Sequence, residues 1–116
     1  MTNNGAPAPR DVLRIRRLND QCRANPFLGK FVMTRGFLSL SVEVQALLMK
    51  AVITFDDFNS DNDPWGEHDF GVVEALGHRA FWKIDVYSKE MNFGSPDPGD
   101  ASVSVRVLTL LLPEEW

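Results

Sequence analysis

Residues 61–87, DNDPWGEHDFGVVEALGHRAFWKIDVY, decide the fold of this chain. The segment opens with acidic and turn-forming residues. It continues as two runs, 70–76 and 79–87, that are rich in the aromatic and β-branched side chains that favour strands. Between the runs, Gly77 can adopt a positive φ without steric cost and His78 tolerates one. The segment therefore predicts a β-hairpin with a two-residue turn at Gly77-His78.

This turn sets the register and the two faces of the predicted hairpin. It pairs Val73 with Trp82 and places Glu74 diagonal to Lys83. Side chains alternate across a strand, so one face is apolar and is expected to pack on the core. That face carries Gly71, Val73, Ala75, Ala80, Trp82, Ile84 and Val86. The other face mixes aromatic and charged side chains, as a partly solvated or ligand-binding surface does: Phe70, Val72, Glu74, Leu76, Arg79, Phe81, Lys83, Asp85 and Tyr87.

Length and composition are those of an ordinary globular chain. The 116 residues are 44% hydrophobic and 24% charged, which suits one domain with its own core. The single cysteine, Cys22, excludes an intrachain disulfide. No apolar run is long enough to span a membrane, and residues 1–10 contain no apolar signal core. We therefore expect a soluble cytoplasmic protein with a disordered tail, 1–9, and one domain, 10–116.

The net charge of −4 is unevenly distributed along the chain. Residues 1–35 contain seven bases and two acids, a balance of +5. Residues 36–116 contain five bases and fourteen acids, a balance of −9. The acidic part argues against binding of nucleic acid by the whole domain, because such domains are usually basic.

Two helices are predicted from apolar residues at helical spacing. The first runs from about Arg10 to Ala24 and ends at Asn25-Pro26, because a residue before proline avoids the helical conformation. The second runs from Val42 to Phe58, with Ser41 as its N-cap. The arginines of the first helix are interpreted as a solvated face, with a phosphate-binding patch and contact with the chain's own acidic loop as alternatives. These arginines are Arg14, Arg16, Arg17 and Arg23.

The strands complete an α-β-α-β-β-β order. Residues 30–35 form a short strand, and 103–112 form a strand that is apolar on both faces and therefore central in its sheet. This order predicts an α+β fold with two helices on one face of a four-stranded, mainly antiparallel sheet. If both helices cover the Trp82 face, the Phe81 face lacks cover within the chain. Such a face marks an interface with a second copy of the chain or with another partner.

The loop 56–69 contains six acids, one histidine and no base. An EF-hand pattern counted from Asp57 requires a glutamate at its twelfth position, where His68 stands, so an EF-hand is rejected. Glu67, His68 and Asp69 are weak candidates for binding a divalent metal, since a histidine with carboxylates suits such ions. The favoured interpretation is structural, with turns at Asp63-Pro64 and Gly66 and with Trp65 packed over the second helix.

The acidic residues of this loop are also compatible with an enzyme, which is the alternative hypothesis. Glu67 and Asp69 with Lys83 and Asp85 would suit a metal-dependent hydrolase or nuclease. Cys22 lies on the apolar face of the first helix, which favours packing over a nucleophilic role.

Several segments carry a resemblance to a known family. DNDPWGEHDFG, FWKIDVY, FGSPDP and RVLTLLLPEEW, together with RIRRLND and AVITFDDF, resemble the bacterial family called domain of unknown function 3768. The resemblance extends from about Arg14 to Trp116. It implies a small bacterial protein that is often encoded on plasmids and other mobile elements, and it supplies no catalytic residues.

The resemblance and the charge pattern together favour a non-enzymatic protein-interaction module, such as an anti-defence inhibitor or a plasmid-maintenance factor. Its partner is a protein or a second copy of the chain, and we expect neither nucleic acid nor membrane as a partner and no obligatory cofactor. The contact is predicted to combine the acidic loop with the adjoining hairpin face. It comprises Asp61, Asp63, Trp65, Glu67, Phe81, Lys83, Asp85 and Tyr87.

Overall fold

Three α-helices and four β-strands make up residues 10–116, which are the residues that this computed structural model describes. The predicted tail, 1–9, lies outside the described residues. None of the described helices is both long and apolar enough to cross a membrane. In chain order the elements are α1 (Val12–Ala24), η1 (Pro26–Leu28), β1 (Lys30–Met33), α2 (Arg35–Leu38), α3 (Val42–Ile53), β2 (Phe70–Ala75), β3 (His78–Tyr87), η2 (Ala101–Val103), β4 (Val105–Leu111) and η3 (Pro113–Glu115).

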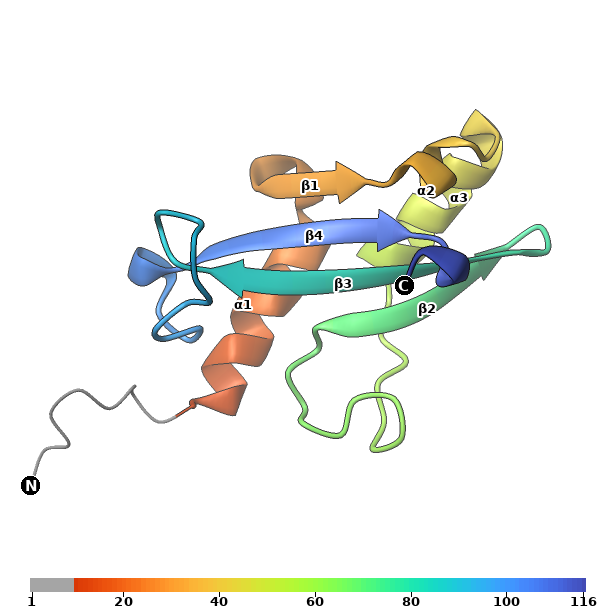
Figure 1. Cartoon of the computed structure of the whole chain (residues 1–116). Coiled ribbons are helices and arrows are strands. Elements are labelled where there is room, and N and C mark those ends of the chain that lie inside the picture. The colour runs from red at the N-terminus through yellow and green to blue at the C-terminus, as the bar shows by residue number, and fades with distance from the viewer. Residues whose placement is uncertain (1–9) are drawn as a thin grey trace, which may run out of the picture.

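The strands form one mixed sheet in the order β1-β4-β3-β2. β3 pairs antiparallel with both β2 and β4, whereas β1 pairs in parallel with β4. The predicted α+β class is therefore confirmed, with one parallel pairing in a mainly antiparallel sheet. The central position predicted for the last strand is also confirmed, because β4 lies between β1 and β3 (Figure 1).

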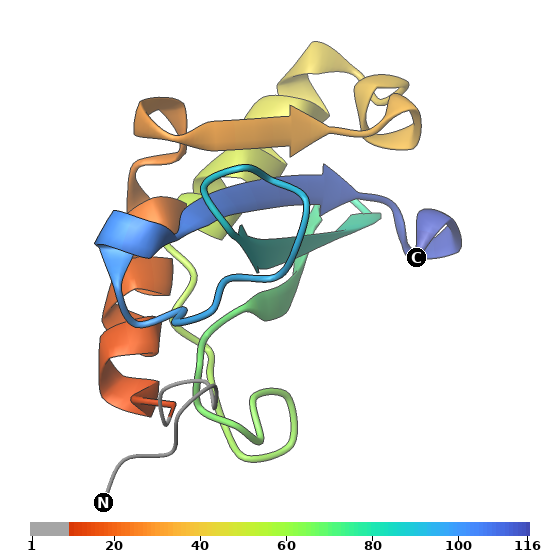
Figure 2. The same ribbon diagram turned by 60° about the vertical axis from the view of Figure 1, so that its left-hand side comes forward.

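The helices α1 and α3 lie on one face of the sheet, and the opposite face carries the last residues of the chain (Figures 1 and 2). The predicted apolar stripe of α3 faces the core through Val44, Leu48 and Val52. Ser41 caps this helix as predicted, since its hydroxyl accepts from the Val44 amide at 3.2 Å. The core between the two layers also buries Phe37, Ala80, Trp82, Leu108 and Leu110 completely.

The hairpin turn lies at Leu76-Gly77, one position earlier than predicted. Both residues have positive φ, 49° and 80°, which is the signature of the type I′ turn that matches strand twist. Val73 therefore pairs with Ala80, so the predicted register is wrong by two residues. A shift of two leaves every side chain on its predicted face.

The register error also changes a predicted charge pair. Glu74 lies directly opposite Arg79 rather than diagonal to Lys83, and its Oε1 is 2.7 Å from Nη2 of Arg79. Both side chains are well exposed, so this pair contributes little to stability.

Predicted boundaries also differ. The last strand is Val105–Leu111 instead of 103–112, because Val103 belongs to η2. α3 ends at Ile53 instead of Phe58, because Phe55 and Phe58 leave the helix and pack edge-on against Trp82, with ring centroids 5.4 and 6.2 Å away. β1 ends at Met33 because Thr34 begins α2, a short helix that the sequence did not predict.

Gly71 is required by the indole that lies across it. It pairs with Trp82, and a Cβ added at Gly71 would lie 2.4 Å from Nε1 of Trp82. The indole is fully buried and has no room to withdraw. We therefore expect Gly71→Ala to lower the free energy of unfolding by about 1–3 kcal/mol, the usual cost of overpacking a core. Urea denaturation of the full chain measures this change in the free energy of unfolding.

The matched control is Gly94→Ala. Gly94 is exposed, its φ is not positive, and an added Cβ would meet nothing within 4 Å. This variant should stay within about 0.5 kcal/mol of the parent protein. Equal stability of the two alanine variants would contradict the packing of Trp82 on Gly71.

Candidate functional site

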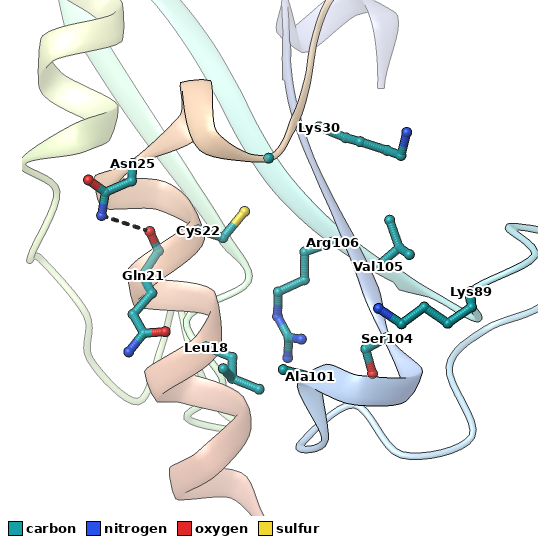
Figure 3. Close-up of a pocket in the computed structure, with 11 residues that line it drawn as sticks. Leu18, Gln21, Cys22, Asn25, Lys30, Lys89, Ala101, Ser104, Val105 and Arg106 are labelled. Carbon is teal, nitrogen blue, oxygen red and sulfur yellow. Dashed lines mark hydrogen bonds between the residues drawn. The ribbon is translucent and has the colours of Figure 1, made fainter.

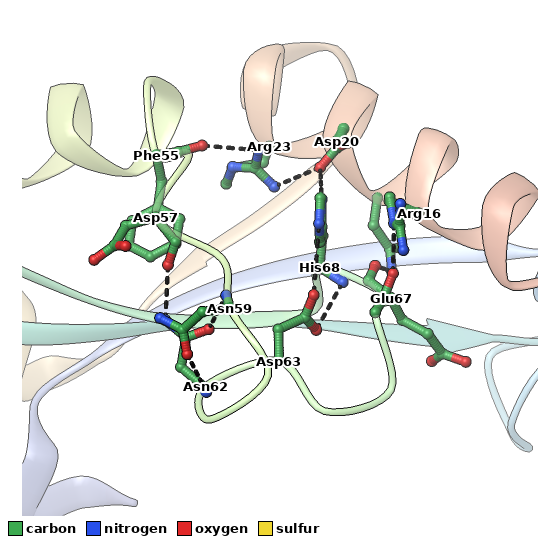
Figure 4. A network of polar contacts seen from close by, with 12 residues as sticks. Arg16, Asp20, Arg23, Phe55, Asp57, Asn59, Asn62, Asp63, Glu67 and His68 are labelled. Carbon is green, nitrogen blue, oxygen red and sulfur yellow. Dashed lines mark hydrogen bonds and ion pairs between the residues drawn. The ribbon is translucent and has the colours of Figure 1, made fainter.

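The acidic loop 56–69 is held by the helix α1. Arg10 makes two hydrogen bonds to the Glu67 carboxylate, of 2.8 and 2.9 Å. Arg16 donates Nε to the Gly66 carbonyl at 2.6 Å, and buried Asn19 donates Nδ2 to the Glu67 carbonyl at 2.9 Å. The structure therefore confirms contact with the chain's own acidic loop for Arg16, whereas Arg14 and Arg17 are exposed as the solvated-face interpretation predicts (Figure 4).

His68 anchors the same loop from the inside. Its ring stacks on Phe58 with centroids 3.7 Å apart and planes 5° apart. Its Nδ1 is 2.8 Å from Oδ1 of Asp20, and its Nε2 is 3.5 Å from Oδ2 of Asp63. The backbone at His68 has φ 57°, an unfavourable value for a side chain with a Cβ. The stacking and the two carboxylates offset this strain and fix the loop against α1.

Arg23 joins the loop and α1 to the core. It is 6% exposed and donates Nη1 to Asp20 and Nη2 to the Phe55 carbonyl, both at 3.1 Å. Its guanidinium lies 5.1 Å from the ring centroids of both Phe58 and Trp82, a cation–π geometry. The predicted solvated position of Arg23 is therefore wrong.

The buried line on α1 explains that error. It is formed by Ile15, Asn19 and Arg23, which are spaced four residues apart, so the helix buries two polar residues. Apolar periodicity pointed instead to Val12, Ile15, Leu18 and Cys22. The sequence places Asp20 within reach of Arg23, but the Phe55 carbonyl and the aromatic rings that bury the guanidinium are distant in the chain.

The three candidate metal ligands, Glu67, His68 and Asp69, have different surroundings. Glu67 binds Arg10, and His68 lies between Asp20 and Asp63. Desolvation and the neighbouring Glu67 carboxylate raise the pKa of Asp69. Within residues 10–116, no three His, Cys, Asp or Glu side chains form a group that could hold a metal ion.

The residues named for a hydrolase are brought together in part. Asp69, Lys83 and Asp85 line one cavity of about 320 Å³ beside Trp116, and Glu67 lies outside its lining. Lys83 Nζ is 3.0 Å from Oδ2 of Asp85, so the two charges neutralise each other. Glu67 instead lines a neighbouring cavity of about 280 Å³, together with Asp69 and Asp85.

The sheet face opposite the helices carries an aromatic patch, which we define as Phe70, Phe81 and Trp116. The three rings make mutual edge-to-face contacts, with centroids 5.1–5.8 Å apart. Trp116 remains 69% exposed, and Val72 beside Phe81 is also exposed. Phe81, Lys83, Asp85 and Tyr87 share this face, as their alternation along β3 predicts.

The loop residues predicted to contact a partner divide into two groups. Asp61 is exposed, and Trp65 is 82% exposed beside Arg10 and Val12, so its predicted packing over the second helix is wrong. Asp63 and Glu67 instead point inward, where they accept hydrogen bonds from His68 and Arg10.

A long-range contact holds Trp116 on the sheet. The Glu115 carboxylate accepts hydrogen bonds from the Thr34 hydroxyl at 2.6 Å, the Gly36 amide at 2.9 Å and the Leu112 amide at 2.8 Å. The bond from Thr34, with those from the amides, lowers the pKa of Glu115. This contact joins residues 113–116 to the start of α2. The sequence did not predict it, because no local pattern indicates a contact between distant residues.

These features describe an α+β protein with helices on one sheet face and an aromatic patch on the other. The chain belongs to the family described as Protein of unknown function (DUF3768), whose model matches residues 33–115. The expected resemblance is thus confirmed, although the matched segment begins at Met33 and leaves α1 outside it. No curated protein and no solved structure matches the chain.

The Glu115 contact predicts a pH-dependent stability. A carboxylate whose folded-state pKa is lowered stabilises the fold above its ordinary pKa of 4.5, and this contribution is lost as the pH falls through the lowered value. Glu115→Gln should therefore be less stable than the parent protein at neutral pH. The difference should shrink as the pH falls below 4.5, as measured by urea denaturation at several pH values.

Glu114→Gln is the control, because Glu114 is exposed and makes no side-chain hydrogen bond or ion pair within residues 10–116. A difference between Glu115→Gln and the parent protein that stays constant across the acid range would contradict the contact.

Proposed function

We propose that this protein is a non-enzymatic interaction module that binds a basic surface of another protein through the open face of its sheet. The observation that carries the proposal is the aromatic patch, which lies opposite the helices and leaves Trp116 mostly exposed. Aromatic side chains of this kind supply much of the binding energy at protein interfaces.

The charge around the patch selects the kind of partner. Residues 36–116 have a balance of −9, and Asp69 and Glu114 lie on or near the open face, where Arg79 is paired with Glu74. Lys83 is the one base among the residues that line the cavity beside Trp116, and it is paired with Asp85. An apolar centre with an acidic rim complements a surface that is apolar at its centre and basic around it.

The acidic loop contributes in two ways. Asp61 and Trp65 are exposed and available for contact, whereas Asp63 and Glu67 support the loop from within. Because the loop is fixed to α1, it loses little conformational freedom when a partner binds.

A basic patch is typical of proteins that handle nucleic acid. An acidic module that covers such a surface would act as an anti-defence inhibitor or a plasmid-maintenance factor. Both roles suit a small accessory protein without an active site of its own.

Site-specific photo-crosslinking tests the proposal in the native host. A photoreactive benzoylphenylalanine at Val72 samples the open face, and one at Leu47 samples the helical side; both positions are 40% exposed. We expect position 72 to crosslink one host protein, which is then identified, purified and titrated with the parent chain. In that titration, Val72→Lys should weaken binding by roughly tenfold or more, since it adds a positive charge against a basic partner.

Leu47→Lys is the matched control and should bind like the parent protein. Equal affinities of Val72→Lys and the parent protein would contradict the proposed surface. Crosslinking of position 72 to a second copy of this chain would replace the proposal with a homodimer.

A further inference from the structure

A second surface, at the end of the sheet where β1 and β4 begin, has a different character. A groove of about 910 Å³ lies between the C-terminal half of α1, the entry to β1 and residues 101–106 (Figure 3). We call it the basic groove. Its volume is within the range of small-molecule sites.

The basic groove concentrates positive charge in an acidic protein. Lys30, Lys89 and Arg106 line it, and no carboxylate does. Within residues 10–116 the two lysines have no ion-pair partner. Arg106 uses Nε for Asn19, at 2.7 Å, and Nη2 for the Pro98 carbonyl, which orients the guanidinium and leaves Nη1 for a ligand.

Asp100, whose carboxylate interacts electrostatically with Lys89, is directed elsewhere. Asp100 accepts hydrogen bonds from the amide and hydroxyl of Ser102, at 2.9 and 2.6 Å, and it does not line the groove. These bonds, together with Arg14 and Lys89, lower the pKa of Asp100. The cations of the groove therefore remain available to an external anion.

The walls of the groove are suited to the body of a ligand. Leu18 and Cys22 provide apolar surface on the side of α1 that faces Arg106, and Val105 adds to it from β4. Burial raises the pKa of the Cys22 thiol, with Arg106 opposing it, so the thiol remains protonated at neutral pH. A protonated, half-buried thiol contributes packing surface to the groove and is a poor nucleophile.

We infer that the basic groove binds a small organic phosphate, with Lys89 and Arg106 holding the phosphate group, Lys30 adding positive charge at the entry to β1, and the Leu18–Cys22 side of α1 packing against the remainder. Lysine and arginine together are the side chains that recognise phosphate, by charge and by directed hydrogen bonds. This site is separate from the aromatic patch and does not depend on the proposed partner.

Calorimetric titration of the full chain tests the site with inorganic phosphate, glucose 6-phosphate, AMP and adenosine. We expect saturable binding of at least one phosphate ester, weaker binding of inorganic phosphate and none of adenosine. A Lys30→Gln, Lys89→Gln double variant should bind that ester roughly tenfold or more weakly, because both lysines lack structural partners and the fold is retained. Lys50→Gln, on an exposed lysine of α3, should bind like the parent protein.

Cys22 gives an independent readout, because it is the single cysteine of the chain and lines the groove. A bound ester should slow its alkylation in the parent protein and not in the double variant. The proposal is overturned if none of the phosphates binds at millimolar concentration, if the double variant binds unchanged, or if adenosine binds as well as AMP. Much tighter binding of a single-stranded oligonucleotide would also overturn it, in favour of a nucleic-acid surface.

Discussion

The guanidinium of Arg23 is the contact on which the rest of the structure depends. It accounts for three attachments at once: to Asp20 within α1, to the Phe55 carbonyl where the chain leaves α3, and to the faces of Phe58 and Trp82. Nε of Arg23 and Nε1 of Trp82 are both buried without a hydrogen-bond partner among the described residues. Burying a donor without a hydrogen-bond partner costs free energy of folding. The packing of α1 and the loop around these two donors must offset that cost.

Arg23 and its neighbours fix the acidic loop to α1, so the loop is a rigid part of the fold. Six carboxylates without a base would repel one another as a free segment, and Arg10, Arg16 and Arg23 on or beside α1 counter that repulsion. Because α1 and α3 lie on one side of the sheet, the aromatic patch on the opposite face is covered, among residues 10–116, chiefly by residues 113–116. The proposed protein-binding surface follows from this arrangement. The basic groove lies at another end, where cations remain that the loop does not use.

Features that repeat along the chain could be predicted from the sequence. The two faces of the hairpin, the buried stripe of α3, the Ser41 cap and the central position of β4 all follow from alternation or local capping. The hairpin register could not be predicted correctly, because Leu76 adopts a positive φ that its side chain does not signal.

Long-range polar contacts also escaped prediction. Thr34 and Glu115 are 81 residues apart in the chain, and the burial of Asn19 and Arg23 depends on acceptors that only the folded chain brings near. The sequence therefore predicted which residues belong to the candidate site. Only the structure shows that Asp63 and Glu67 point inward and that Asp61 and Trp65 are exposed.

Amide hydrogen exchange in the acidic loop tests most directly whether the loop is docked. The amides of Asp63, Gly66 and His68 make hydrogen bonds within the loop, and α1 holds that loop through the Gly66 and Glu67 carbonyls and the His68 ring. We expect these amides to exchange far more slowly than in an unfolded chain, with protection approaching that of the sheet. Exchange at unprotected rates, with the sheet still protected, would show a free acidic loop and contradict the central role of Arg23.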